Sequence, residues 1–229
     1  MSREEILAGA RKLIERKGLR ELSMPGLARS LRCGVTSLYW YFRSKDDLLV
    51  ALAEEVATEL YQRLPPIGDR PWDRELEACF VAFREEALLA PVYLALFKHH
   101  ARFLFSRPGV AQMIVRRLED VTAMLVRAGL SAEQAAHSYG VCSAYTRGFV
   151  LLERGLVGEN PEAGFEEAID RTVARLDPKE FPTLTQLPSF ERAMRLDDAQ
   201  FRLGLRLLIE GIRRELPTAS APRFGLQHS

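Results

Sequence analysis

The sequence predicts an all-α protein. Apolar residues recur at the 3.6-residue helical period in nearly every segment, and no segment has the alternation of a convincing strand or repeats another segment. Serine caps, glycines and prolines separate the periodic segments as helix starts and stops. With 229 residues, 47% of them hydrophobic, the chain can bury one sizeable core and hold a small domain beside it.

Three short helices are expected at the N-terminal end. The first spans about 3–17, and Gly18 follows where a left-handed C-terminal cap is needed. Ser23 is expected to cap a second helix that ends near Leu31. A third short helix is expected over about 35–42. Helices of this length with a tight connection before the third are typical of a helix-turn-helix.

Ser44 is expected to cap a fourth, longer helix. Asp46 and Asp47 fall in its first turn, where carboxylates are favourable, and its apolar pattern runs to about Leu64. Three prolines and a glycine between residues 65 and 71 then break the chain. The sequence therefore predicts a body that begins after this break.

The body is expected to be helical as well. Its helical patterns cover about 72–90, 91–106, 109–128, 131–157, 163–176 and 197–216. Gly129, Ser131 and Gln134 combine a helix stop with a capping box. The stretch 177–196 is interpreted as a looser connection with room for a short helix, and the small, polar segment 217–229 as a disordered tail.

Composition excludes several classes of protein. No run of about 18 apolar residues indicates a membrane span, and the N-terminus lacks the apolar core of an export signal. The three cysteines, Cys33, Cys79 and Cys142, have no metal-type spacing, and so sparse a set suits a reducing compartment. A cytoplasmic protein is expected.

Catalysis and metal binding are not expected. The four histidines pair with no nucleophile and form no ligand cluster, and no Gly-rich phosphate loop or G-x-S-x-G turn is present. His99 and His100 are adjacent, so on a helix they point about 100° apart and cannot readily share one ion. We therefore expect no metal site and no cofactor.

Charge is distributed unevenly. Residues 1–45 contain ten Lys and Arg against four Asp and Glu, whereas the remaining 184 residues contain 22 against 27. A small basic domain joined to a mildly acidic one is typical of a nucleic-acid-binding protein whose second domain has a separate function. The alternative is a basic face that is merely solvated.

The stretch CGVTSLYWYFRSKDDLL gathers four aromatic residues beside basic ones. Leu38 and Phe42 are four residues apart and can face a small core together with Cys33. In a helix-turn-helix the start of the third helix meets base edges, so the hydroxyl-bearing side chains are left facing DNA. Those side chains are Thr36, Ser37, Tyr39 and Tyr41, and Lys45 follows at the positive end of the fourth helix.

The segment SMPGLARSLRCGVTSLYWYFRSKDDLLVAL resembles the DNA-binding domain of the tetracycline-repressor (TetR) family of transcription regulators. The resemblance covers residues 3–55 and implies a helix-turn-helix domain at 1–47, connected to the body by a fourth helix at 45–64. The candidate DNA-binding residues are Ser23, Val35, Thr36, Ser37, Tyr39, Tyr41 and Lys45.

Two residues depart from the family pattern. Arg32 stands where a turn glycine is usual, and a positive φ there would cost about 1 kcal/mol. Pro25 stands where some relatives place a base-reading arginine. The operator of a relative therefore cannot be transferred to this chain.

The body resembles the ligand-binding half of the tetracycline-repressor subgroup through AGLSAEQAAHSYGVCSAYTRGFVLLERG and DDAQFRLGLRLLIEGI. The resemblance implies a helical ligand-binding and dimerisation domain at 65–216. The candidate pocket residues are Tyr61, Phe83, Phe97, His100, Phe103, Arg107, Met113, Tyr139 and Tyr145, each of which has core packing as its simpler interpretation.

Magnesium–tetracycline is not the expected effector. In tetracycline repressors a histidine before an Arg-Pro turn and a glutamate of a later helix help to hold that complex. Registering on Arg107-Pro108 and on Gly148 places Phe103 and Leu152 at those two positions, with Glu153 adjacent. A phenylalanine cannot coordinate a cation, so the sequence predicts a different effector.

A homodimer is expected through the helices at 131–157 and 197–216. Gly140, Ala144 and Gly148 form an i,i+4 row of small residues, and the last helix has apolar residues over more than one face. Extra burial within a monomer is the alternative. In such a dimer the third helix of each subunit, about 34–36 Å from its counterpart, could read one half of a near-palindromic operator.

These observations favour a DNA-binding repressor released by a small, largely apolar effector, with the fourth helix transmitting the change. The alternatives are an activator of the same family and a helical protein-interaction module that does not bind DNA. Loss of affinity for random DNA with added salt separates the last alternative from the others.

Overall fold

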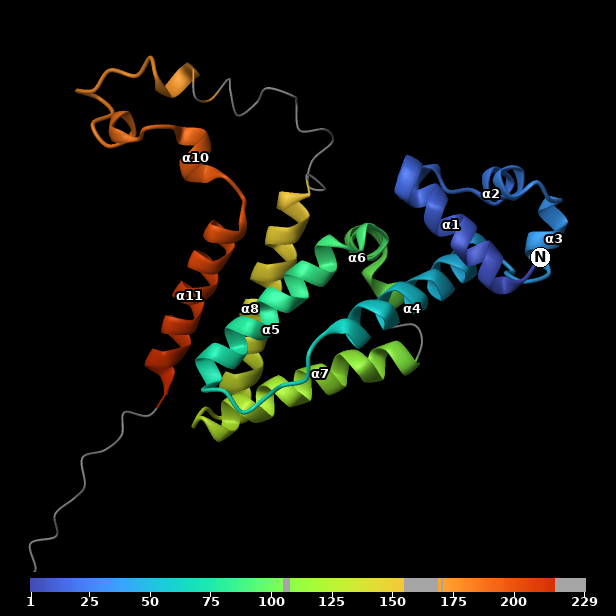
Figure 1. The fold of residues 1–229 in the computed structure, drawn as a ribbon, viewed down its shortest axis with the longest axis horizontal. Helices are drawn as coiled ribbons and strands as arrows, with labels where there is room; N and C mark the ends of the chain where they lie inside the picture. The colour runs from blue at the N-terminus through green and yellow to red at the C-terminus, as the bar shows by residue number, and fades with distance from the viewer. Residues whose placement is uncertain (105–107, 155–168, 170, 217–229) are drawn as a thin grey trace, which may run out of the picture.

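The computed structural model describes residues 1–104, 108–154, 169 and 171–216, with only the backbone of 98–104 and of 191. Every regular element in these ranges is helical, so the predicted all-α fold is confirmed. The α-helices are α1 Arg3–Lys17, α2 Met24–Leu31, α3 Val35–Tyr39, α4 Lys45–Arg63, α5 Trp72–Leu88, α6 Pro91–Leu104, α7 Pro108–Arg127, α8 Ala132–Glu153, α10 Phe190–Met194 and α11 Asp198–Glu215 (Figure 1). Within the described ranges no helix has the length and apolarity needed to cross a membrane.

The N-terminal helices begin and end on local signals. Ser2 starts α1 with a capping box, and Ser23 caps α2 as expected because its hydroxyl accepts from the backbone N–H of Gly26 at 3.2 Å. At Gly9, a Cβ would lie 2.7 Å from Cδ2 of Leu31, so glycine lets α1 and α2 pack closely. Arg32 ends α2 in the left-handed region, with φ 54° and ψ 42°.

The third helix is shorter than the predicted 35–42. Helix α3 ends at Tyr39, and the backbone N–H groups of Tyr41 and Phe42 both donate to the carbonyl of Leu38. The chain then extends into Ser44, which must adopt a non-helical conformation to cap α4. Leu38 and Phe42 are nonetheless buried as predicted, in a cluster against which Cys33 packs.

The body helices match their predicted spans within a few residues. The capping box of Ser131 and Gln134 starts α8, and Gly129 has the positive φ of a helix stop. The connection before α11 holds α10 and the 3-10 turn Leu184–Gln186. The tail 217–229 and most of the expected helix at 163–176 lie outside the described residues.

Two hydrophobic clusters hold these helices together. The first joins α1–α4 to α6, with Phe83 of α5 and Val150 of α8. The second joins α5, α7, α8 and α11. Helices α1–α3 lie at one end of an elongated molecule, and α4 runs from them into the body (Figure 1). Because the first cluster continues through α4, apolar packing links the N-terminal helices to the body without a gap.

A polar contact reinforces the link between α1 and α4. The Arg11 guanidinium donates to Oε2 of Glu59 at 2.7 Å, and the same nitrogen lies 3.9 Å from Oε1 of Glu55. Helix α1 and the 3-10 turn Leu19–Glu21 also contact α6. The N-terminal helices are therefore attached to both α4 and α6.

Candidate functional site

Three consecutive aromatic side chains form an exposed tip at the end of α3. Tyr39 is 48% exposed, Trp40 86% and Tyr41 42%. The tip is anchored from below, because Leu38 and Phe42 on either side are buried and the Arg3 guanidinium lies 5.3 Å from the Phe42 ring centroid. Exposed aromatic surface of this extent favours coverage by a partner.

The candidate DNA-binding residues lie at the starts of α2 and α4, along α3 and in the turn that follows α3. Thr36 and Ser23 are exposed, whereas Val35, Ser37 and Lys45 are half-exposed. The Ser23 hydroxyl already accepts from the backbone N–H of Gly26 and so also serves the fold. The structure thus brings all seven candidates to the helix-turn-helix and the adjoining first turn of α4.

At the tip, Tyr41 is held by a hydrogen bond, and Trp40 is a further exposed aromatic residue. The Tyr41 hydroxyl donates to the backbone carbonyl of Met1 at 2.5 Å, which orients the ring. Trp40 was not among the candidates, although it is the most exposed of the three aromatics. Its position in the sequence between the candidates Tyr39 and Tyr41 is a reason to add it to the candidate DNA-binding residues.

Lys45 begins α4, where the unpaired backbone N–H groups of the first turn favour an anion. The Ser44 hydroxyl takes one of these groups by accepting from Asp47 N at 3.0 Å. Asp46 and Asp47 bring negative charge to the same turn, and Asp47 also accepts from the backbone N–H of Arg43 at 3.2 Å. Lys45 is therefore the cation of a turn that also carries two carboxylates.

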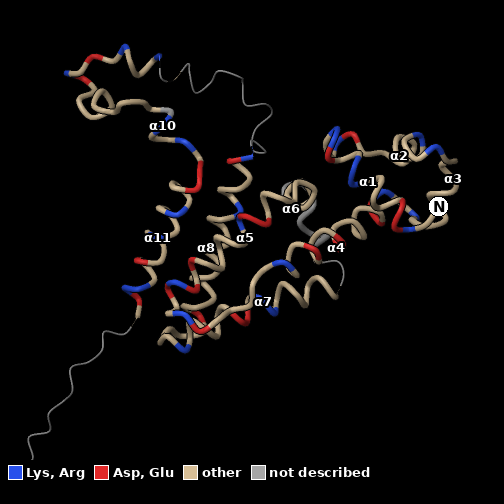
Figure 2. The backbone as a smooth tube through the Cα atoms, viewed as in Figure 1, with Lys and Arg blue, Asp and Glu red and all other residues tan. Residues whose placement is uncertain are grey.

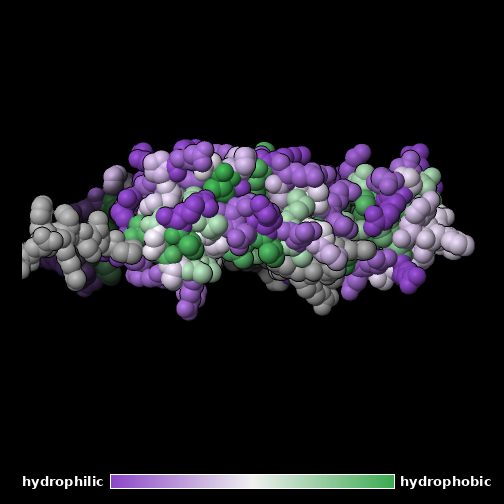
Figure 3. Space-filling view, turned by 90° about the horizontal axis from the view of Figure 1, so that it is seen from below, coloured by the Kyte–Doolittle hydropathy of each residue, from purple (hydrophilic) through white to green (hydrophobic). Residues whose placement is uncertain are grey.

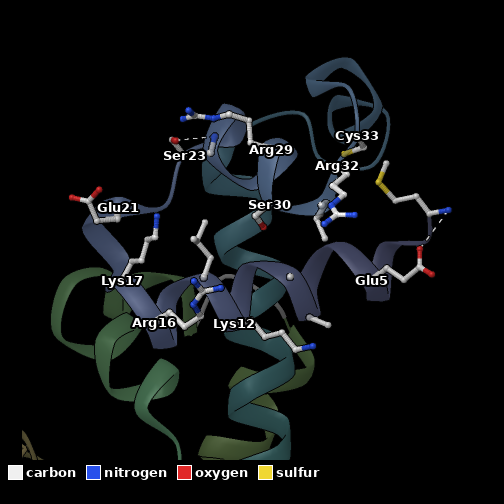
Figure 4. A pocket seen from close by; sticks show the side chains of 16 residues that line it. Glu5, Lys12, Arg16, Lys17, Glu21, Ser23, Arg29, Ser30, Arg32 and Cys33 are labelled. Carbon is white, nitrogen blue, oxygen red and sulfur yellow. Dashed lines mark hydrogen bonds and ion pairs between the residues drawn. The ribbon is translucent and has the colours of Figure 1, made fainter.

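A basic groove lies between α1 and α2. It has a volume of about 1220 Å³, and its cationic side chains are those of Lys12, Arg16, Lys17, Arg29 and Arg32 (Figure 4). Figure 2 shows Lys and Arg recurring along these two helices. In the described part of the chain none of the five is within 4.0 Å of a carboxylate, although Glu21 and Glu5 also line the groove. The groove is thus part of the helix-turn-helix domain, and the candidate Ser23 is one of its lining residues.

Three of the candidate pocket residues belong to one aromatic cluster. The Phe83 ring centroid lies 6.2 Å from that of Tyr61 and 6.4 Å from that of Tyr93, and Phe97 stacks on Tyr93 at 6.3 Å. Tyr61, Phe83 and the candidate Tyr139 line a cavity of about 10 Å³, room for about one water molecule. A molecule larger than water would fit here only if side chains moved apart.

Two arginines line the same cavity and were not predicted. Arg147 of α8 and Arg117 of α7 reach it together with Leu64, Cys79 and Phe80. Arg147 lies eight residues after Tyr139, on the same face of α8, and this spacing was a usable signal. The side chains brought together here are thus aromatic and basic.

The remaining candidates lie elsewhere or are not described. Met113 packs against the first hydrophobic cluster. Tyr145 stacks on Phe201 of α11 at 5.5 Å, and its hydroxyl donates to the Phe201 carbonyl at 3.0 Å, within the second cluster. Arg107 and the side chains of His100 and Phe103 fall outside the described residues.

Helices α8 and α11 expose apolar and small residues. Leu207 is 66% exposed and Leu203 49%, although Phe201, Leu205, Ile209 and Ile212 already bury one face of α11. On α8, a Cβ built at Gly140 or Gly148 would meet no atom within 4 Å. Hydrophobic side chains are visible over the body in Figure 3, which shows one face of the molecule. These surfaces leave room for close approach of further helices.

Family comparisons cover both parts of the chain. Residues 6–52 match the model of bacterial regulatory proteins of the tetR family. Residues 89–216 match the model of the tetracyclin repressor-like C-terminal domain. The first match contains the helix-turn-helix, and the second contains α6, α7, α8 and α11.

Individual relatives agree with these matches. An HTH-type transcriptional repressor of Mycobacterium tuberculosis is 32% identical, over 97% of this chain and 90% of its own length. The tetracycline repressor protein class C of Escherichia coli is 28% identical, over 93% and 91%. The crystal structure of the Streptomyces coelicolor protein ActR in complex with actinorhodin shares the fold, with a TM-score of 0.71 and 24% identity over 95% of this chain and 99% of that one.

Proposed function

The chain belongs to the tetracycline-repressor (TetR) family of DNA-binding transcription regulators, and we propose that it is a ligand-released repressor. A homodimer would hold a near-palindromic operator through its two α3 helices and release it when a small molecule binds in the body. In this proposal residues 1–47 form the DNA-binding unit, α4 connects it, and 65–216 form the ligand-binding and dimerisation domain.

The tip of α3 carries the proposal. Tyr39, Trp40 and Tyr41 are exposed together while Leu38 and Phe42 hold the turn in place, which supports a surface built to be covered. Thr36 and Ser37 precede the tip with hydroxyl groups that suit base edges and phosphates. Lys45 adds a positive charge suited to binding DNA phosphates whatever the base sequence.

The basic groove is proposed as an extension of the same interface. Its five cations lack carboxylate partners among the described residues, and it lies within the helix-turn-helix domain, where Ser23 and Arg32 also line it. Phosphates of DNA flanking the half-site match this charge. The groove would therefore add affinity that does not depend on sequence.

The dimer is proposed to form through α8 and α11. Leu203 and Leu207 are apolar surface that the protomer leaves exposed, and Gly140 and Gly148 allow a partner helix to approach closely. This pairing would set the separation of the two α3 helices, on which recognition of a palindrome depends.

The effector site is proposed around the aromatic cluster of α4, α5, α6 and α8. Tyr61 belongs to α4, the helix that begins at Lys45, so displacement of its ring can be passed to the DNA-binding unit. The same fold holds a small molecule, actinorhodin, in the ActR complex. Binding here would shift a two-state dimer away from its operator-bound separation.

Selection of random duplexes by the purified protein tests the DNA-binding proposal. The expected winner is a near-palindrome with half-sites about one DNA turn apart. Substitution Lys45→Ala should weaken binding to all duplexes about equally, because it removes a phosphate contact. Substitution Thr36→Ala or Tyr41→Phe should alter sequence preference.

Two results would contradict this function. Binding to random DNA that does not weaken with added salt would favour a protein-interaction module instead. A palindromic winner that tolerates both Tyr39→Ala and Lys45→Ala would remove these residues from the interface.

A further inference from the structure

Arg147 places a positive charge inside the aromatic cluster. Its guanidinium carbon lies 4.9 Å from the ring centroid of Phe83 and 5.4 Å from that of Phe97. Nη2 donates to the Tyr61 hydroxyl at 3.3 Å, and Nη1 is 3.5 Å from the carbonyl oxygen of Ser143. The Nε atom is shielded from solvent and has no acceptor among the described residues.

The polar neighbours of Arg147 are neutral. Burial raises the pKa of Tyr61, Tyr93 and Tyr139, so all three phenols keep their protons at neutral pH. No carboxylate of the described chain forms an ion pair with Arg147. An arginine stays protonated in proteins, so among the described residues this cation is held by rings and dipoles without a counter-anion.

A second guanidinium faces the same cavity. Arg117 donates from Nη1 to the Pro65 carbonyl at 2.7 Å and from Nη2 to Cys79 Sγ at 3.1 Å. Its Nε is also shielded and has no acceptor in the part of the chain that the structure describes. Glu75 is the carboxylate in electrostatic range of Arg117, but it already accepts from Arg70 Nε at 2.6 Å and from Gly68 N at 2.9 Å. The described lining of the cavity therefore has an excess of positive charge.

A shielded cation without a counter-anion is costly, and an anion that enters offsets part of the cost. A neutral apolar molecule would fill the space between the rings but leave both Nε atoms without acceptors. An anion without a ring would pair with the guanidinium but make poor contact with Phe83 and Tyr139. A molecule with both features uses both parts of the cavity.

Given the proposed function, we propose that the effector is a planar aromatic carboxylate whose oxygen atoms pair with Arg147. Its ring lies among Tyr61, Phe83 and Tyr139, which separate to admit it because the closed cavity holds about 10 Å³. Arg117, which lines the same cavity, supplies a second positive charge. The effector, which the sequence predicts to be largely apolar, is in this proposal an aromatic acid.

Calorimetric titration of the full chain with 2-naphthoate and with its neutral analogue 2-naphthamide tests the charge requirement. We expect the carboxylate to bind at least about tenfold more tightly than the amide. Arg147→Met should abolish this difference by weakening the carboxylate alone, and Arg147→Lys should retain part of it. Arg116→Met removes the same charge from an exposed position of α7 and should leave both affinities unchanged.

Equal affinities of the native chain for the two probes, or no binding of naphthoate up to about 5 mM, would overturn the proposal. Retention of the preference in a folded Arg147→Met variant, checked by circular dichroism, would do the same. Operator release by naphthoate is measured separately by fluorescence anisotropy. Binding of naphthoate that depends on Arg147 but does not release DNA would uphold the anion site and contradict the ligand-released repressor.

Discussion

Arg84 and Glu153 form a two-pronged ion pair between α5 and the end of α8. Nη2 of Arg84 lies 2.6 Å from Oε1 of Glu153, and Nε lies 3.0 Å from Oε2. The third nitrogen donates to Asp198 at the start of α11 at 3.0 Å, and the guanidinium lies over the Phe201 ring. One buried arginine thus ties together α5 and both helices of the proposed dimer surface.

Removing Glu153 should therefore cost stability. We expect Glu153→Ala to lower the free energy of unfolding by about 3 kcal/mol, because it leaves Arg84 buried with one remaining carboxylate. Asp198 is more than half exposed, so Asp198→Ala should cost about 1 kcal/mol or less. Urea denaturation measures both values, and equal costs would contradict a dominant role for the Arg84–Glu153 pair.

The Arg84–Glu153 ion pair is also relevant to whether the protein can bind magnesium–tetracycline. Glu153 is adjacent to the position where tetracycline repressors have a metal-holding glutamate, but its carboxylate is taken by Arg84. Leu152 stands at that position itself and is exposed. We expect tetracycline with magnesium not to release the operator, as measured by anisotropy of a labelled duplex. Release at low concentrations would show that the prediction is wrong.

Much of the N-terminal fold could be predicted because its signals are local. The serine hydroxyls that cap helices accept from a backbone N–H three residues further on, and Leu38 and Phe42 are separated by one helical turn, so the sequence predicts both features directly. The left-handed conformation of Arg32 was suggested only by the family resemblance, because related proteins usually have glycine at that position of the turn. The early end of α3 was missed because it depends on the extended backbone that Ser44 requires.

The pocket was harder to predict because its contacts are distant in sequence. Tyr61, Phe83, Phe97 and Arg147 come from four helices, and their meeting depends on how those helices pack. Aromatic residues at helical spacing gave candidates, but nothing local distinguished Phe83 from Tyr145, which packs on α11. Arg147 was overlooked because arginines usually lie at the surface.

Removing charge from the basic groove should weaken the salt dependence of DNA binding. If the groove holds flanking phosphates, Lys12→Gln combined with Arg16→Gln should reduce the slope of log affinity against log salt by about 2. The control, Arg127→Gln with Lys179→Gln, removes two exposed charges from the body and should leave the slope unchanged. Equal slopes for the two double variants would exclude the groove from the interface.

A charge on the outer face of α11 should break the dimer. We expect Leu207→Glu to yield a folded monomer with greatly weakened operator binding, because a carboxylate in an apolar interface is strongly unfavourable. Val115→Glu adds the same charge at an exposed position of α7 and should leave the dimer intact. Sedimentation equilibrium measures both masses, and a dimeric Leu207→Glu variant would place the interface elsewhere.

Glycine at position 32 should stabilise the chain. Arg32 has φ 54°, so we expect Arg32→Gly to raise the free energy of unfolding by about 1 kcal/mol. Arg32→Ala removes the same charge but keeps the Cβ, so it should bring no such gain. Thermal denaturation of the two variants separates backbone strain from charge, and equal melting temperatures would argue against strain at this position.

The first hydrophobic cluster packs α4 against both the N-terminal helices and the body, so movement at one end of α4 can displace the other end. Tyr61 lies near one end of this helix and Lys45 at the other, with 19 residues, or about 28 Å, along the axis. A tilt of about 6° at the Tyr61 end carries the Lys45 end through about 3 Å, a distance comparable to the spacing of one base pair along the duplex. Arg11 of α1 is hydrogen-bonded to Glu59 of α4, so a tilt of α4 would also move the exposed aromatic tip of α3. In the proposed function, displacing the Tyr61 ring would thereby shift this tip relative to the major groove of the operator.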